Sequence, residues 1–213
     1  MNNPIVVDYY SDVLCIWAWL AQSKLSTLNQ QLVGNIHINH HYMNLFANIH
    51  EKINKQWQDR NAFQGYAKHV KDIAQQHNVF IHPDIWSTQQ PTTSSNAHLI
   101  IKAIECAYGQ ERSVVLADHF RQAFFEKAMD ISNLEVLFDL AFEQGLQRQK
   151  IQEFINSGQA IAKLMSDHQK QQQLALQGSP SYVIDNARQI LYGNVSVEVI
   201  KANVVAHISN EAT

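Results

Sequence analysis

The sequence predicts an α/β protein in which a β-α-β unit and a β-β-α unit flank a long helical segment. Segments rich in β-branched and aromatic residues lie near the two ends of the 213-residue chain, and between them apolar residues recur at helical spacing. Apolar residues make up 46% of the chain and charged residues 16%, which is typical of a globular protein with a sizeable core.

The first 45 residues are predicted to form the β-α-β unit. Residues 4–10, "PIVVDYY", have the composition of a strand, and a helical pattern runs from Cys15 to Leu32 before it stops at Gly34. Residues 35–46, "NIHINHHYMNLF", begin with alternating apolar and polar positions and predict a second strand. Two strands joined by a helix favour a parallel pair with a right-handed crossover.

The middle of the chain is predicted to be helical. The apolar spacing predicts helices over residues 63–74, 97–108, 114–129, 134–145, 148–156 and 159–176. Residues 132–135, "SNLE", have the form of a capping box with Ser132 at the N-cap, and Asn96 is predicted to cap an earlier helix. Residues 88–96, "TQQPTTSSN", are the most loop-like stretch.

The end of the chain returns to β structure. Residues 179–185, "SPSYVID", and 188–193, "RQILYG", are predicted to form a hairpin, followed by a helix over residues 195–208. This order is that of a thioredoxin fold interrupted by a large all-helical insertion. We therefore expect a thioredoxin-like domain made of residues 1–46 and 177–213, and a helical insertion domain made of residues 47–176.

Several local sequences are similar to the DsbA-like thioredoxin superfamily, and most of all to its FrnE-type branch. That family carries Cys-x-x-Cys at the start of a long helix, and "YYSDVLCIWAWLA" matches it except at Ala18. The segment "GSPSYVID" resembles the family's Gly-x-Pro turn, in which the proline is cis. The segments "SSNAHLIIKAIE" and "MDISNLEVLFDLAFEQGL" resemble the insertion helices, so the resemblance covers nearly the whole chain.

The resemblance implies a site built around one cysteine. Cys15 takes the place of the catalytic thiol, Pro180 lies across from it, and the backbone of Ser179 pairs with an extended ligand. Related kappa-class glutathione transferases and 2-hydroxychromene-2-carboxylate isomerases bind glutathione and place serine where Cys15 stands. Their glycine-containing segment after the hairpin is only partly matched by "YGNVS". The residues expected to contact substrate or glutathione are Trp17, Asn44, Ser179, Pro180 and Asn194.

The position of Cys15 predicts a moderately acidic thiol. The unpaired N–H groups at a helix N-terminus favour the thiolate, and this dipole is worth about 0.3–1 kcal/mol. Ile16 and Trp17 add no charge, and Asp12 opposes ionisation if it lies close. We therefore expect the pKa of Cys15 to lie somewhat below the ordinary thiol value.

Ala18 stands where the second thiol of a dithiol enzyme would be. A mixed disulfide on Cys15 must then be resolved by an outside thiol, and we expect glutathione as this co-substrate. An engineered replacement of a natural cysteine would leave the same sequence. Cys106, the other cysteine, lies in a predicted helix between apolar residues and is interpreted as a packing residue.

The other features favour no further ligand. His37 and His41 face one way on the predicted strand and His40 the other, so no metal site is expected there. We also expect no bound cofactor. A net charge of -3 with dispersed basic residues indicates no nucleic-acid partner, and no apolar run is long enough for a membrane span. The chain begins at Met1 without a leader pattern, so we expect a cytoplasmic protein; a homodimer stays open.

Three functions follow from these residues. The first is a DsbA/FrnE-like thiol-disulfide oxidoreductase, an enzyme that uses Cys15 alone and acts on glutathione or on a thiol or disulfide protein substrate. The second is a glutathione-dependent transferase or isomerase in which Cys15 orients the glutathione thiol. The third is a redox-silent module that keeps the groove beside Pro180 for peptide or partner binding, with Cys15 as an inert buried residue.

Overall fold

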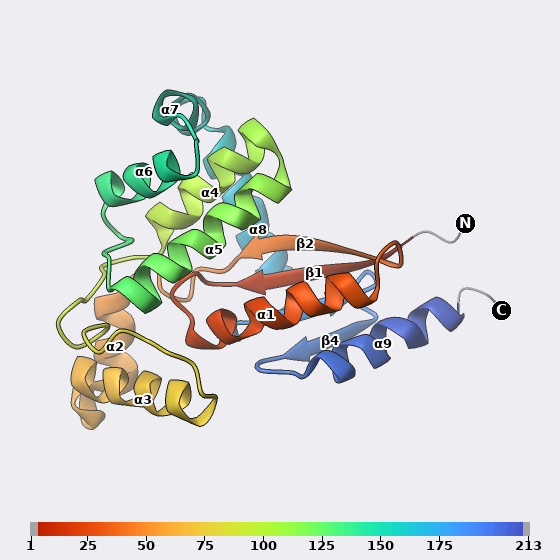
Figure 1. Cartoon of the computed structure of the whole chain (residues 1–213), viewed down its shortest axis with the longest axis horizontal. Coiled ribbons are helices and arrows are strands. Elements are labelled where there is room, and N and C mark those ends of the chain that lie inside the picture. Colours follow the sequence, from red (N-terminus) through yellow and green to blue (C-terminus); the bar gives the residue numbers. More distant parts are fainter. Residues whose placement is uncertain (1–3, 211–213) are drawn as a thin grey trace. The chain divides into compact units, whose positions relative to one another are not determined.

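The computed structural model describes residues 4–210, and the chain forms two compact units (Figure 1). The sheet unit comprises Met1–Met43 and Asp167–Thr213, and the helical unit comprises Asn44–Ser166. Residues 1–3 and 211–213 lie outside the described residues. The expectation about the start of the chain, which includes residues 1–3, therefore stays a prediction. The sequence predicted domain limits after residues 46 and 176, and these limits stay a prediction.

The sheet unit has a mixed sheet of four strands in the order β2-β1-β3-β4. The strands are β1 (Ile5–Ser11), β2 (Ile36–Tyr42), β3 (Ser181–Ile184) and β4 (Gln189–Tyr192). Strands β1 and β2 are parallel, as predicted, while β3 runs antiparallel to both β1 and β4. The thioredoxin fold predicted from the element order is therefore confirmed.

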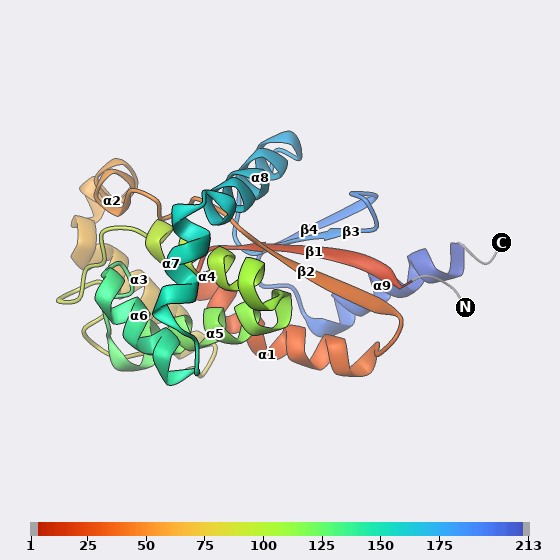
Figure 2. The same cartoon turned by 90° about the horizontal axis from the view of Figure 1, so that it is seen from above.

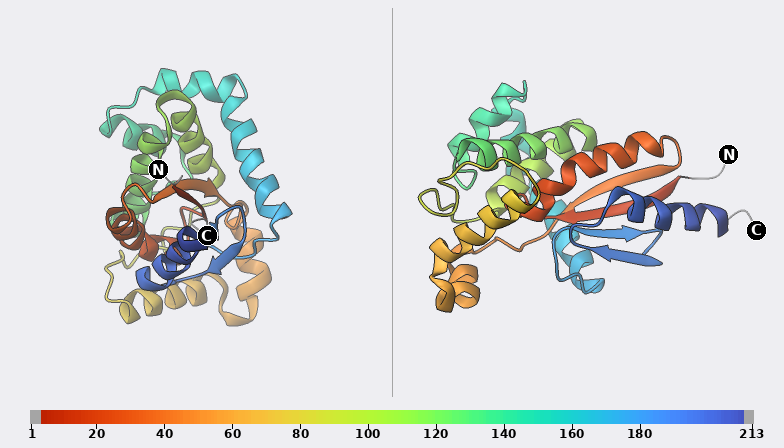
Figure 3. Two further views of the ribbon diagram at one scale, coloured as in Figure 1. Left: turned by 90° about the vertical axis from the view of Figure 1, so that its right-hand side faces the viewer. Right: turned by 60° about the horizontal axis from the view of Figure 1, so that its bottom comes forward.

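Two helices cover one face of this sheet. Helix α1 (Ile16–Gln31) connects β1 to β2, and α9 (Val197–Asn210) follows the β3–β4 hairpin, shown in blue at the right of Figure 3. Figure 2 shows α1 and α9 on the same side of the sheet.

The core between the sheet and these helices follows the period of two in β1. Val7 and Tyr9 are buried on this side, together with Leu28 of α1 and Val204 of α9. Truncating a fully buried leucine such as Leu28 to alanine costs about 2–5 kcal/mol. Because side chains alternate along a strand, Asp8 lies on the opposite face.

The helical unit is built from consecutive helices. They are α2 (Ile49–Trp57), the 3-10 turn η1 (Gln58–Arg60), α3 (Ala62–Gln76), α4 (Ser95–Tyr108), α5 (Gln110–Lys127), α6 (Leu134–Glu143), α7 (Arg148–Asn156) and α8 (Gln159–Gln173), whose last turns belong to the sheet unit. Gly109, at φ +86°, joins α4 to α5, a backbone angle that an L side chain rarely adopts. Trp86 is fully buried against the rings of Phe46, Tyr66 and Phe124.

Two local predictions in the helical unit were wrong, and one helix was missed. Helix α2 was not predicted, because its sequence is mostly polar and only Ile49 and Ile53 are buried. Asn133 rather than Ser132 is the N-cap of α6, since its side chain accepts from the N–H of Glu135. Asn96 lies inside α4 instead of capping it, and its side-chain amide donates to the Ser132 carbonyl at 2.7 Å.

Candidate active site

Cys15 lies at the junction between β1 and α1. It is the N-cap residue of α1 with an extended backbone, and its N–H donates to the Asp12 carbonyl at 3.1 Å. The Asp12 side chain accepts from the Leu14 N–H at 3.0 Å, which closes the turn that leads into the helix. The Cys15 side chain does not cap the helix, and its carbonyl accepts the N–H of Trp19. The thiol is thereby placed at the first turn of α1.

The segment before β3 meets this junction. The Cys15 thiol donates to the Ser179 carbonyl with an Sγ···O distance of 3.3 Å, across 164 positions of the sequence. The Asp12 N–H donates to the Ser179 hydroxyl at 3.1 Å. The Ser179–Pro180 peptide bond is cis, and the Pro180 carbonyl accepts from Gly193 at 2.8 Å. Cys15, Ser179 and Pro180 therefore lie together, as the resemblance implied.

Burial decides the protonation of the thiol. The Cys15 residue is only 7% exposed, and removal from water raises its pKa above the ordinary thiol value. Hydrogen bonds from the Ser179 side chain and from the N–H groups of Ala18 and Trp17 favour the thiolate, while the Asp12 charge disfavours it. The prediction of a lowered pKa was wrong, because the helix terminus was visible in the sequence and the burial was not.

Ala18 occupies the position of the absent second thiol. It lies in the first turn of α1 and is fully buried, so its methyl group packs where a resolving sulfur would stand. Both cysteines of the chain are free thiols. Cys106 is partly exposed on α4 in the helical unit, and its interpretation as a packing residue stays a prediction.

The other predicted contact residues have defined local environments. Trp17 is partly buried in the first turn of α1. The Asn194 side-chain oxygen accepts from the Lys24 ammonium, which also donates to the Val195 carbonyl at 3.2 Å, so Asn194 ties α1 to the segment before α9. Asn44 is exposed two residues after the end of β2, as the first residue of the helical unit. Ligand contact by these residues stays a prediction.

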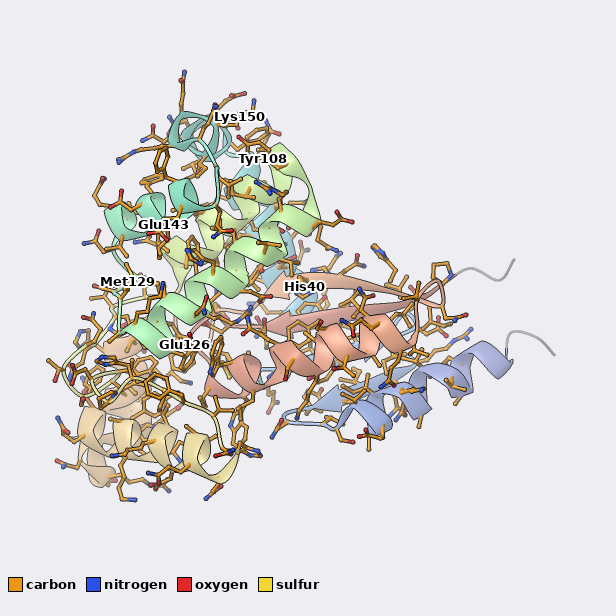
Figure 4. All side chains as sticks on the ribbon, in the orientation of Figure 1. His40, Tyr108, Glu126, Met129, Glu143 and Lys150 are labelled. Atoms are coloured by element: carbon orange, nitrogen blue, oxygen red, sulfur yellow. The ribbon has the colours of Figure 1, made fainter. Side chains whose placement is uncertain are left out.

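The three histidines of β2 have separate roles. His37 is exposed, His40 packs its ring edge-on to Tyr9 (label in Figure 4), and His41 stacks on Tyr10 at a centroid distance of 4.5 Å. The edge-on pair and the stacked pair lie on opposite faces of the sheet, as the alternation predicted. Within residues 4–210 no group of three or more histidine, cysteine, aspartate or glutamate side chains is arranged to hold a metal ion.

One buried polar cluster was not predicted. His41 lies between two carboxylates, with Nδ1 2.7 Å from Asp167 Oδ1 and Nε2 3.0 Å from Asp8 Oδ1. Asp167 is on α8 and 126 positions away, so no sequence pattern linked it to His41. Asp12 was noted in the sequence only as an opposing charge, whereas in the structure it bonds both to the turn and to Ser179.

Comparison with known families agrees with this geometry. The sequence matches the family model of the DSBA-like thioredoxin domain over residues 6–205. The chain belongs to the DsbA-like thioredoxin family, which confirms the resemblance; its FrnE-type branch stays a prediction. No curated protein matches the chain in sequence at a significant level. In the described part of the chain, no helix has both the length and the apolar character that crossing a bilayer requires.

Several solved structures share the fold. A candidate protein disulfide isomerase from Nitrosomonas europaea superposes with a TM-score of 0.78 at 14% identity, covering 99% of this chain and 100% of that one. The cytosolic disulfide reductase DsbM from Pseudomonas aeruginosa gives 0.69 at 18% identity, with coverage of 97% and 98%. A 2-hydroxychromene-2-carboxylate isomerase gives 0.67 at 14%, also covering 97% and 98%. At these identities the likeness concerns the fold.

Proposed function

We propose that this chain is a thiol-disulfide oxidoreductase that works through Cys15 alone and uses glutathione as the second thiol. The observation that carries the proposal is the contact of the Cys15 thiol with the Ser179 carbonyl, at a helix N-terminus where Ala18 replaces any second sulfur. A thiol in this place can form a mixed disulfide, but the adjacent position offers no sulfur to break it.

The reaction needs two exchange steps. The ionised Cys15 sulfur attacks the glutathione sulfur of a glutathionylated substrate, the S–S bond breaks, and the substrate leaves as a thiolate that takes up a proton. A glutathione thiolate then attacks the glutathione sulfur bound to Cys15, which releases oxidised glutathione and regenerates the Cys15 thiolate. The substrate disulfide is reduced and glutathione is oxidised, so two electrons move from glutathione to the substrate.

The raised pKa of Cys15 gives this reaction a pH dependence. Burial keeps most of the thiol protonated at neutral pH, so the first step speeds up as pH rises toward the pKa of Cys15. A substrate that brings a donor or a positive charge next to Cys15 would offset the cost of ionisation. Trp17, Asn44, Ser179, Pro180 and Asn194 are the residues proposed to contact glutathione or the substrate chain.

The proposed setting is the cytoplasm. The support is that DsbM, which shares the fold, is named a cytosolic disulfide reductase and has also been solved with GSH, at a TM-score of 0.68 and 16% identity. Glutathione keeps thiols reduced in that compartment and would supply the second exchange step. A homodimer is a separate proposal, to be checked by light scattering of the purified chain.

A second candidate function is a glutathione-dependent transferase or isomerase. The observation that favours it is the buried, protonated Cys15 thiol, which can redirect its hydrogen bond from the Ser179 carbonyl to a bound glutathione sulfur without itself exchanging. The fold shared with 2-hydroxychromene-2-carboxylate isomerase is compatible with this use.

One experiment separates these functions. The protein is incubated with oxidised glutathione and weighed intact, and reduction of a glutathionylated peptide is assayed for the wild type, Cys15→Ser and Cys106→Ser. Adduct and turnover that depend on Cys15 alone support the oxidoreductase. Glutathione binding that survives Cys15→Ser supports the transferase or isomerase, and neither adduct nor binding leaves a redox-silent binding module.

A further inference from the structure

The cluster around His41 joins three elements of the sheet unit. Asp8 comes from β1, His41 from β2 and Asp167 from the end of α8. Asp167 makes two bonds to β2, since its Oδ1 lies 2.7 Å from His41 Nδ1 and its Oδ2 accepts the Tyr42 N–H at 3.0 Å. On the other side of the ring, Asp8 Oδ1 accepts from His41 Nε2 and from the Asn39 amide. The side chains of His41 and Asp167 are only 11% and 5% exposed.

Counting protons shows which form of His41 this arrangement requires. Each short N···O contact needs one hydrogen, whereas a neutral imidazole carries only one N–H and an ionised carboxylate carries none. Two contacts therefore need two protons, and imidazole is the stronger base of the two group types. His41 is thus an imidazolium between two carboxylates.

Other charged and titratable groups around the ring agree with this form. Burial alone would lower the pKa of His41, but hydrogen bonds and charges from Asp167 and Asp8 raise it above the ordinary value. Tyr10, stacked on the ring, stays neutral because burial and the two carboxylates raise its pKa. From α8, Lys170 adds a positive charge near Asp8, and His168 is kept neutral by its own burial.

The cluster also lies near the start of the segment that connects α8 to Ser179, because Asp167 lies in the C-terminal half of α8. After Asp167, α8 ends at Gln173, and the Gln171 side chain donates to the Leu176 carbonyl at 3.3 Å. The Ser181 hydroxyl then holds the Gly178 carbonyl at 2.6 Å, directly before Ser179. One end of this connection is therefore fixed by β3 and the other by Asp167 on His41.

We propose that His41 is a positioning residue: as an imidazolium it holds the end of α8 to β2 and thereby keeps Ser179 against the Cys15 thiol. The inference rests on the proposed function only in treating Cys15 as the working thiol. When His41 loses its proton, one carboxylate faces a ring nitrogen without hydrogen, and the connection from Asp167 to Ser179 loosens.

The sign of the pH dependence follows from the raised pKa. A basic group whose pKa is higher in the folded than in the unfolded protein stabilises the fold fully below its unfolded value. That contribution is lost as pH rises through the folded-state pKa of His41. The segment between residues 168 and 178 should therefore become more mobile on the alkaline side, while acid down to the pKa of the carboxylates leaves it in place.

The test uses the whole chain and measures His41 itself. The pKa of His41 is determined by NMR from its ring carbon-bound proton in the wild type, in Asp8→Asn and in Asp167→Asn, with an unstructured histidine peptide as the external reference. We expect His41 to titrate above the reference in the wild type and its pKa to fall in both variants. A His41 that titrates at or below the reference in the folded wild type overturns the proposal, whatever the variants do.

Hydrogen exchange and alkylation test the positioning. His41→Asn should raise exchange at residues 168–178 about tenfold, because at least one charge-assisted bond is lost, and should speed the limiting rate of Cys15 alkylation by iodoacetamide severalfold. His37→Asn, on the same strand, should change neither. Unchanged protection in a folded His41→Asn or, if it does not fold, in Asp167→Asn contradicts the proposal. None of these readouts needs turnover, so they can succeed while the peptide assay fails, and the reverse.

Discussion

Two buried groups of the sheet unit, Cys15 and His41, both have raised pKa values but reach opposite charge states. For the Cys15 thiol a raised pKa means the neutral form, because burial is opposed only by hydrogen bonds and is reinforced by the nearby Asp12 charge. For the His41 imidazole a raised pKa means the charged form, because two carboxylates outweigh its burial. Burial thus sets the charge of a group only where no opposite charge lies within bonding distance.

The largest expected effect is the loss of turnover when Cys15, the neutral one of these two groups, is replaced. Cys15→Ser should reduce turnover of a glutathionylated peptide to the uncatalysed background, because a hydroxyl at neutral pH does not exchange with a disulfide. Cys106→Ser, in the helical unit, should keep wild-type turnover. Activity retained in Cys15→Ser would show that Cys15 is not the exchanging thiol.

Ala18→Cys tests the reason for using an outside thiol. A sulfur at this buried position in the first turn of α1 should form a disulfide with Cys15, seen as a loss of two hydrogens in the intact mass after mild oxidation. In a single turnover, the reduced variant should then release glutathione from Cys15 as the free thiol without added glutathione, while continued turnover still needs glutathione to reduce the new disulfide. If the two thiols stay reduced under conditions that oxidise glutathione, the idea that Ala18 alone removes dithiol chemistry is wrong.

The interaction of the charged His41 with α8 can be removed by a substitution at Asp167. Asp167→Ala removes the more buried carboxylate on His41 and leaves the buried Tyr42 N–H without its acceptor, which should cost about 3–5 kcal/mol of unfolding free energy in urea. The matched control is Asp72→Ala, whose partner Lys68 is exposed, and its loss should cost about 0–1 kcal/mol. Equal losses in the two variants would mean that the His41 cluster contributes no more than a surface pair.

The smallest expected effect concerns the Asp12 charge, which raises the pKa of Cys15, whereas the carboxylates next to His41 favour its charged form. Asp12→Asn removes the charge next to Cys15 but keeps an oxygen that can accept the Leu14 N–H, so the pKa of Cys15 should fall. The rate of alkylation by iodoacetamide at pH 7 should rise about two- to tenfold, with the pH profile displaced toward acid. Asp12→Ala also loses the turn, so a gain shared by both variants would indicate loosening rather than charge.

Local patterns predicted most of the elements of the chain. The strands and long helices have periodic apolar residues, so the β-α-β start, the closing hairpin and α7 were found where the structure has them. Helix α2 was missed because it contributes few buried residues. Ser132 was wrongly predicted as the cap of α6 because Asn133 offers an equivalent oxygen one residue later. Such choices between neighbouring polar residues depend on the direction of the chain entering the helix.

The sequence by itself determined the fold class, the place of Cys15 at a helix start and the absence of a thiol at Ala18. Each is a local property, readable from spacing and residue type. Only the tertiary structure decided how far Cys15 is buried, and which way its pKa moves, because burial depends on segments 164 positions apart. The charge of His41 was decided in the same way, since Asp167 reaches it from α8 and the electrostatic energy depends on distance in space rather than along the chain.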